Sequence, residues 1–165
     1  MPLYLRSTTP EDKQFIYRLV YETLYEQLCA WAWAPAIRQQ ILDMQVRAKN
    51  GSYRMMYPEA HHAIIMLDDD PIGRLIIDRS RECYELVDIS ILSKHRSAGI
   101  GTRLILAMCT EAEMMKKPIR LSVSITNPRA AALYRRLGFR VIEEQPMDQL
   151  MERAPGAVSQ VIAQP

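Results

Sequence analysis

The chain has 165 residues, 48% of them hydrophobic and 24% charged, which is the composition of an ordinary globular protein with one core. Its formal net charge of +2 is too small to indicate binding to nucleic acid or to an anionic membrane. No apolar run approaches the roughly 20 residues of a membrane span, and the N-terminus lacks the apolar core of a signal peptide. We therefore expect a soluble protein with neither nucleic acid nor membrane as a partner.

The three cysteines, Cys29, Cys83 and Cys109, form no CxxC pair. An odd number of cysteines in unrelated contexts favours reduced, buried thiols, and from this we expect a cytoplasmic protein. The histidines also lack the spacing of metal ligands. We predict no metal site.

The N-terminal part of the chain predicts one short strand and two helices. Leu3–Arg6 is the strand. A helix begins at Thr9-Pro10, where a capping hydroxyl is followed by a proline and then by acids in the first turn. Pro35 opens a second helix with apolar residues at helical spacing, and Asn50-Gly51 is expected to end it.

Aromatic side chains gather around these two helices. We expect Trp31 to pack in the core. Trp33, Tyr53 and Tyr57 stand at or beside loops, where the wall of a binding pocket is as good an interpretation as packing.

From His62 onward the pattern changes to strands that alternate with helices. The expected strands are 62–67, 72–79, 83–92, 119–125, 139–144 and 148–153, and the expected helices are 99–115 and 127–138. The strand–helix–strand unit from 83 to 125 should be parallel and right-handed. The sequence predicts an α+β fold, in which about four helices flank a mixed, mostly antiparallel sheet of 6–7 strands. Residues 1–153 form one domain, and residues 154–165 a loose tail.

A glycine-bearing turn between strand 83–92 and helix 99–115 predicts a phosphate site, because backbone N–H groups and a helix N-terminus favour an anion. The dinucleotide pattern G-x-G-x-x-G lacks its third glycine here, and no G-x-x-x-x-G-K-[ST] run exists. What the turn does contain is R-x-x-G-x-G, from Arg96 to Gly101.

This motif resembles the acetyl-CoA loop of the GCN5-related N-acetyltransferase (GNAT) superfamily. The apolar strand ends at Ile91, five residues before Arg96, as in that family. A second motif follows in the right order, since Asn127–Phe139 resembles the family's N…A…LY..LGF helix and strand. The clear resemblance covers about Ala60–Glu144. Two departures are Ser93, where the family often has proline, and Ser97-Ala98, where glycine is common at the first position.

The resemblance implies the acyl-CoA N-acyltransferase fold, with acetyl-CoA as co-substrate. The turn N–H groups would hold the pyrophosphate together with Arg96. Edge groups of Ile89 and Ile91 would pair with the pantetheine arm. Asn127 would be both helix cap and cofactor contact. The residues expected at the pyrophosphate are Arg96, Ser97, Ala98, Gly99, Ile100, Gly101 and Thr102.

Acetyl transfer needs a neutral amine to attack the thioester. A lysine-like amine with a pKa of about 10.4 is neutral about once in 10³ molecules at pH 7, so losing the proton costs about 4–5 kcal/mol without a base. The candidate bases are Glu85, where several family members carry a catalytic glutamate, and Asp88; a water chain is the alternative. The two acids point to opposite faces of a regular strand, and a β-bulge would change that parity.

Tyr134 is the expected general acid, because the resemblance places its hydroxyl near the coenzyme A sulfur, where it would protonate the leaving thiolate. Tyr134 therefore counts as both a catalytic and a cofactor-binding residue.

The acceptor pocket is expected to be formed by Trp33, Gln45, Tyr53 and Tyr57, since the two N-terminal helices correspond to the family's variable substrate region. Aromatic side chains suit a small amine or an amino-acid-like acceptor. A protein lysine or N-terminus stays open, as do a coenzyme A-binding sensor without catalysis and another acyl donor or nucleotide ligand. Homodimers are common in the family, but no residue here decides that question.

Overall fold

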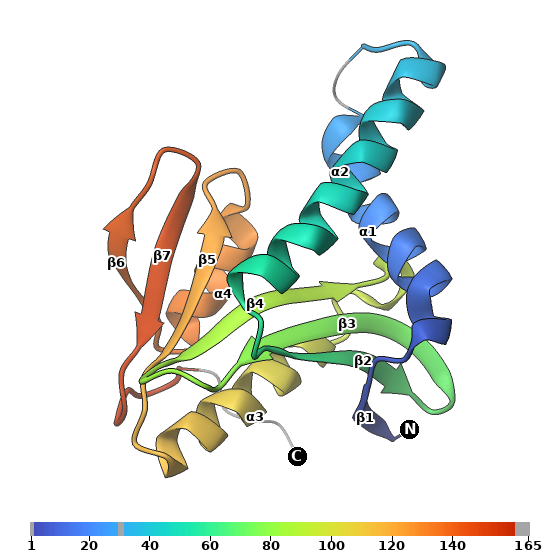
Figure 1. Ribbon diagram of the computed structural model, residues 1–165. Helices are drawn as coiled ribbons and strands as arrows, with labels where there is room; N and C mark the ends of the chain where they lie inside the picture. Colours follow the sequence, from blue (N-terminus) through green and yellow to red (C-terminus); the bar gives the residue numbers. More distant parts are fainter. Residues whose placement is uncertain (1, 30–31, 161–165) are drawn as a thin grey trace. The chain divides into compact units, whose positions relative to one another are not determined.

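The computed structural model describes residues 2–29 and 32–160 (Figure 1). These residues form four α-helices and a seven-stranded mixed sheet in the order β1-β2-β3-β4-β5-β7-β6, which confirms the predicted fold class. The chain divides into two compact units. The first contains the described residues up to Ile76 together with Asp88–Ala98, and the second contains Ile77–Val87 and the described residues from Gly99 onward.

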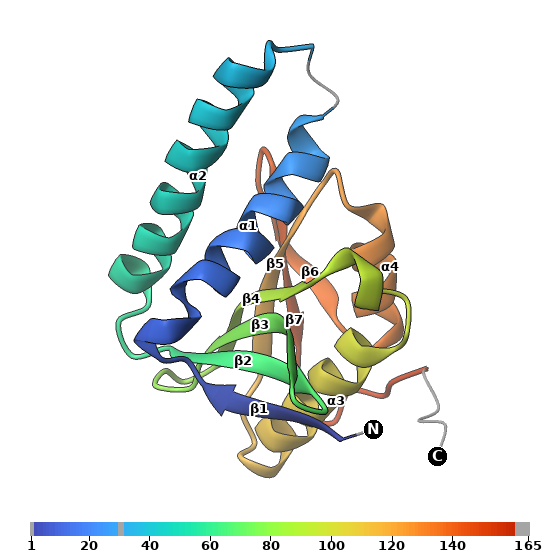
Figure 2. The same cartoon turned by 90° about the vertical axis from the view of Figure 1, so that its right-hand side faces the viewer.

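The first unit begins with strand β1, which pairs antiparallel with β2 from Leu3 opposite Leu67 to Ser7 opposite Ala63. A 3-10 turn leads into α1, and α2 returns beside it; Figures 1 and 2 show the two helices side by side. Strands β3 and β4 each contribute a part to this unit. The elements are β1 (Leu3–Ser7), η1 (Pro10–Asp12), α1 (Lys13–Leu28), α2 (Pro35–Met56), β2 (His61–Leu67), β3 (Asp70–Asp78) and β4 (Tyr84–Ile91).

Helix α2 is longer than the sequence predicted. The expected end at Asn50-Gly51 was wrong, because the helix continues to Met56. The side chain of Asn50 accepts a hydrogen bond from Nη1 of Arg74 at 2.8 Å. A tertiary contact thus uses an asparagine that would otherwise favour a turn.

The second unit holds the C-terminal strands and two helices. Residues Tyr84–Leu86 of β4 pair with β5 in parallel, as predicted. β7 pairs antiparallel with β5 on one side and with β6 on the other, and α4 packs beside β5. The elements are α3 (Ile100–Met114), β5 (Ile119–Ser124), α4 (Pro128–Arg136), β6 (Arg140–Glu144) and β7 (Asp148–Arg153).

Hydrogen bonds hold part of the segment expected to be a loose tail. Both carboxylate oxygens of Glu113 accept the N–H of Gly156, at 2.8 and 2.9 Å. The N–H of Gln160 donates to the carbonyl of Arg136 at 2.8 Å. Residues 154–160 therefore lie against their own unit. The single-domain boundary at residue 153 stays a prediction.

Apolar side chains are buried in each unit, but in α2 they are not those that the helical spacing predicted, since Ile37 and Met44 are exposed. In the first unit Val20 and Leu24 of α1 pack with Leu42 and Val46 of α2. Gly73 of β3 lies so close to β4 that a Cβ there would meet the carbonyl oxygen of Ser90 at 2.4 Å, so only glycine fits. Trp31, expected in the core, lies outside the described residues.

No helix within the described ranges is long and apolar enough to cross a membrane. Those ranges also contain no group of three or more His, Cys, Asp or Glu side chains placed to hold a metal ion.

The turn before α1 generates a prediction on stability. Asp12 is buried and accepts hydrogen bonds from Nη1 and Nη2 of Arg6, at 2.8 and 2.7 Å, and from the N–H of Thr9 at 2.8 Å. The Arg6 bonds lower the pKa of Asp12 from 3.8 to about 2. Since the folded state holds the lower pKa, this stability is complete above about pH 4 and is lost as the pH falls toward 2.

Asp12→Asn should lower the free energy of unfolding by about 1 kcal/mol at pH 7, a value reduced for the exposure of Arg6. Urea unfolding at pH 7, 4 and 2.5 checks it. The difference in the free energy of unfolding between wild type and variant should shrink toward pH 2.5. A difference independent of pH would show that the charge of Asp12 does not contribute to stability through Arg6.

Candidate functional site

The glycine turn connects β4 to α3 through a short 3-10 helix, η2 (Ser93–His95). Ser97 and Gly99 both have positive φ, 63° and 75°. A Cβ on Gly99 would meet nothing within 4 Å, so the left-handed backbone, rather than a lack of space, favours glycine. α3 begins at Ile100, and the first N–H groups of a helix have no partner within it. A glycine in the left-handed region followed by a helix start is suited to an anion.

Arg96 lies next to this turn and has protein partners of its own. Its Nε donates to the carbonyl of Ile91 at 2.7 Å, and its Nη1 donates to the Glu26 carboxylate at 2.6 Å. Glu22 lies 4.0 Å from Nη2. The residue predicted to meet the pyrophosphate is therefore held between the end of β4 and two acids of α1.

A buried polar cluster surrounds Asp88 in the first unit. Nε and Nη2 of Arg74 donate to Oδ2 of Asp88, at 3.1 and 3.0 Å, and the hydroxyl of Ser90 donates to the same carboxylate at 3.1 Å. Nη1 of Arg74 donates to Asn50. The guanidinium also lies over the ring of Tyr53, 5.6 Å from its centre. The cluster connects α2, β3 and β4.

Tyr53 belongs to this cluster. Burial raises the pKa of its hydroxyl, and the negative charge of Asp88 raises it further. Tyr53 is therefore a neutral phenol at physiological pH, able to donate a hydrogen bond but not to act as a base.

The ion pair limits what Asp88 can do. The Arg74 side chain is 3% exposed and that of Asp88 9%. A proton on Asp88 would leave the guanidinium buried without a counter-ion, which is costly. The geometry therefore favours a positioning role for Asp88 over that of a base.

Glu85, the other candidate base, lies in the second unit in a looser setting. Its carboxylate accepts from Sγ of Cys83 at 3.5 Å, and burial, followed by the charge of Glu85, raises the pKa of that thiol. The charge of Glu85 also contributes to raising the pKa of Arg120, but Nε of Arg120 donates its hydrogen bond to Glu152, at 2.7 Å. Glu85 is half-buried, and its carboxylate accepts from a weak donor, whereas that of Asp88 is bound by a guanidinium.

The second motif folds as the sequence suggested. Oδ1 of Asn127 accepts the N–H of Ala130 at 3.1 Å and caps α4. Tyr134, half-buried near the end of that helix, packs its ring against Phe139 at 5.8 Å between centres. Asn127, Tyr134 and Glu85 thus belong to the second unit, whereas Asp88, Ile89, Ile91 and Arg96 belong to the first.

The four residues expected to form the acceptor pocket are distributed along α2. Tyr53 and Tyr57 share its C-terminal end, where the N–H of Tyr57 donates to the carbonyl of Tyr53 at 3.0 Å. Trp33 precedes the opposite end, and with a rise of 1.5 Å per residue Pro35 and Tyr53 are about 27 Å apart. Gln45 is exposed between them. Trp33 therefore does not share one small pocket with Tyr53, because a continuous helix separates them.

Sequence reasoning missed Arg74, Asn50 and Glu22. A signal was available for Arg74, since a lone arginine inside the apolar run IGRLIID must find a partner when the strand is buried. For Asn50 the sequence indicates only a helix end. Nothing in the sequence marks Glu22.

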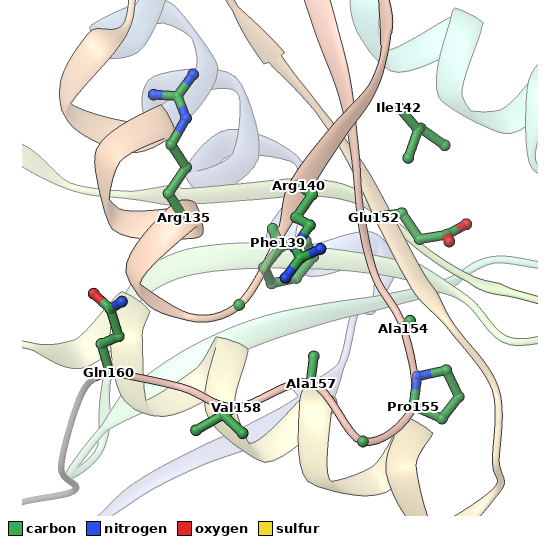
Figure 3. Close-up of a pocket in the computed structure, with 12 residues that line it drawn as sticks. Arg135, Phe139, Arg140, Ile142, Glu152, Ala154, Pro155, Ala157, Val158 and Gln160 are labelled. Atoms are coloured by element: carbon green, nitrogen blue, oxygen red, sulfur yellow. The ribbon is translucent and has the colours of Figure 1, made fainter.

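The structure also has a cavity of about 650 Å3 in the second unit, between the β6–β7 region and residues 154–160 (Figure 3). Phe139, Arg140 and Glu152 line it, and Glu152 is paired with Arg120 at 2.7 Å. None of the predicted site residues lines this cavity.

Comparisons with known proteins place the chain in a family. Residues 21–139 match the sequence model of the "Acetyltransferase (GNAT) family". No curated protein matches significantly.

Solved structures show the same fold. The PaiA N-acetyltransferase of Thermoplasma acidophilum in complex with coenzyme A has a TM-score of 0.71 and 16% identity, over 93% of this chain and 99% of that one. An acetyltransferase of Thermus thermophilus has a TM-score of 0.68 and 20% identity, over 93% of this chain and 97% of that one. A spermidine N-acetyltransferase chimera of SpeG from Vibrio cholerae and hSSAT has a TM-score of 0.62 and 20% identity, over 93% of this chain and 96% of that one.

The family match extends over more than half of the 165 residues and includes both motifs, the turn after β4 and the helix that Asn127 caps. The chain belongs to the GNAT family of acetyltransferases.

Proposed function

We propose that the protein transfers the acetyl group of acetyl-CoA to a primary amine by direct attack on the thioester, with a small or amino-acid-like amine as the favoured acceptor. The observation that carries this proposal is the turn before α3, where Gly99 in the left-handed region opens a helix N-terminus beside Arg96. That geometry suits a pyrophosphate, and it occurs within a GNAT sequence match. A cytoplasmic location is part of the proposal, supported by three free cysteines; of these only Cys109 is buried as expected, whereas Cys83 is half-buried and Cys29 is exposed.

Each part of coenzyme A has a candidate partner. The N–H groups of residues 97–102 and the guanidinium of Arg96 would bind the pyrophosphate. Backbone groups of Ile89 and Ile91 would meet the pantetheine amides, although the carbonyl of Ile91 also accepts from Arg96. Asn127 and Tyr134 would lie toward the thioester end. The bound cofactor supplies the activated acetyl group.

The chain's own residues would move the protons. The amine must lose a proton to attack, and Glu85 is the better base because Asp88 is committed to Arg74. Water acting alone is the alternative. As the carbon–sulfur bond breaks, the hydroxyl of Tyr134 would give its proton to the leaving sulfur. The acceptor would enter at the Tyr53–Tyr57 end of α2, where the neutral phenol of Tyr53 is hydrogen-bonded to Asp88.

Coenzyme A binding is the first test. Coenzyme A at 1 mM should raise the melting temperature of the wild type, because a ligand that binds only the native state stabilises it by mass action. ADP and NAD at the same concentration are controls for a general nucleotide site. Absence of a shift with coenzyme A and acetyl-CoA would refute the proposal, and a larger shift with NAD would redirect it to another ligand.

Turnover separates an enzyme from a sensor. Tyr134→Phe should lower kcat about 10²-fold, since general acids contribute at least that much, with the coenzyme A-induced thermal shift preserved. Thiol release over a panel of primary amines, spermidine and lysine peptides measures kcat and identifies the acceptor. A wild type that binds coenzyme A but acetylates none of these amines would favour the non-catalytic sensor.

The two acids of β4 should respond differently to neutralisation. Asp88→Asn leaves Arg74 buried and uncompensated, so the free energy of unfolding should fall by about 3–5 kcal/mol.

Glu85→Gln should leave the free energy of unfolding within about 0.5 kcal/mol of the wild type and lower kcat. The loss of kcat should be smaller at high pH, where more of the amine is already neutral. Urea unfolding and a pH profile of kcat measure both effects. A stable, inactive Asp88→Asn variant would instead make Asp88 the base.

A further inference from the structure

Two carboxylates of α1 bind the loop that enters the glycine turn: Glu26 pairs with the Arg96 guanidinium at 2.6 Å, and Glu22 binds the loop backbone. Oε1 of Glu22 accepts the backbone N–H of Ser93 at 2.7 Å. Burial, the largest influence, acts to raise the pKa of Glu22, but the bonds from the Ser93 backbone and hydroxyl, together with the charge of Arg96, lower it overall. Glu22 is therefore a carboxylate at neutral pH.

The loop that Glu22 holds is closed on itself. The N–H of Arg96 donates to the carbonyl of Ser93 at 3.1 Å, and the Arg96 guanidinium reaches back to Ile91. Glu22 touches the first residue of this loop directly and lies 4.0 Å from the guanidinium at its end. One side chain of α1 thus contacts both ends of the segment that precedes the left-handed Ser97.

Position 93 is suited to this bond only because it carries an N–H. Ser93 opens η2, and Leu92 before it is extended, with ψ of 139°. That backbone would accept proline, which lacks an N–H. With serine the loop has an additional donor, and Glu22 is placed to use it.

We infer that Glu22 is a positioning residue for coenzyme A, acting through the Ser93 N–H and through Arg96; this rests on the proposed function. It fixes the entry to the turn before ligand binds, which reduces the entropy lost on binding. The same helix packs on α2 through Val20, Leu24, Leu42 and Val46. The helix pair proposed to carry the acceptor end and the entry to the cofactor turn are therefore joined through α1.

The test is titration calorimetry with coenzyme A as the probe, and no acceptor is needed. Glu22→Ala should weaken binding about three- to tenfold, as expected for losing one pre-ordered contact. Glu22→Gln retains an oxygen acceptor for the Ser93 N–H and should restore affinity to within about twofold. Glu11→Ala, at an exposed acid before α1, is the control for the same change of net charge and should match the wild type.

A double-mutant cycle with Ser93→Pro tests the route. Proline removes the N–H and stiffens the loop, so Glu22→Ala should lose most of its effect in that background. Melting temperatures without ligand show whether each variant is folded. In an amine assay, the Glu22→Ala change should appear in KM for acetyl-CoA rather than in kcat.

Three outcomes would overturn the inference: unchanged or tighter coenzyme A binding by Glu22→Ala, failure of Glu22→Gln to rescue binding, or an equal effect of Glu22→Ala with and without Ser93→Pro. A wild type that binds no coenzyme A would refute the proposed function itself, and the inference with it.

Discussion

The first unit depends on one buried ion pair, Arg74 with Asp88. Neither side chain has enough exposure to be solvated alone, so each holds its charge only while the other is present. Through Asn50 and the ring of Tyr53 the same guanidinium reaches helix α2. Strands β3 and β4 and the C-terminal half of α2 are thereby aligned by a polar contact whose geometry is directional, which apolar packing alone would not provide.

This constraint separates structural from chemical roles among the acids of β4. Asp88 is the more buried acid, and desolvation often marks a catalytic group; here the buried charge is satisfied by Arg74. Glu85, three residues earlier in β4, accepts a hydrogen bond from the weak donor Cys83. In a family whose reaction needs an amine to lose a proton, the acid with the looser partners is the better candidate base.

Much of the fold followed from local patterns. Proline after a capping residue marked the starts at Pro10 and Pro128, and alternation marked β5 and β7. Asn50-Gly51 misled because a helix stop is a weak local preference, and the bond from Arg74 outweighs it. The sequence pattern assigned Trp33 and Tyr53 to one pocket, but the continuous helix that begins at Pro35 places them at opposite ends of α2.

By itself the sequence determined the fold class, the GNAT resemblance and the position of the glycine turn. These three features depend on hydrophobic periodicity and on residue types at fixed spacing, and both are set by residues close together in the chain. Only the tertiary structure decided which acid is paired with Arg74, that Glu22 reaches Ser93, and which aromatic residues share an end of α2. Those outcomes depend on side chains far apart in the chain, and no local preference encodes where a buried charge will find its counter-ion.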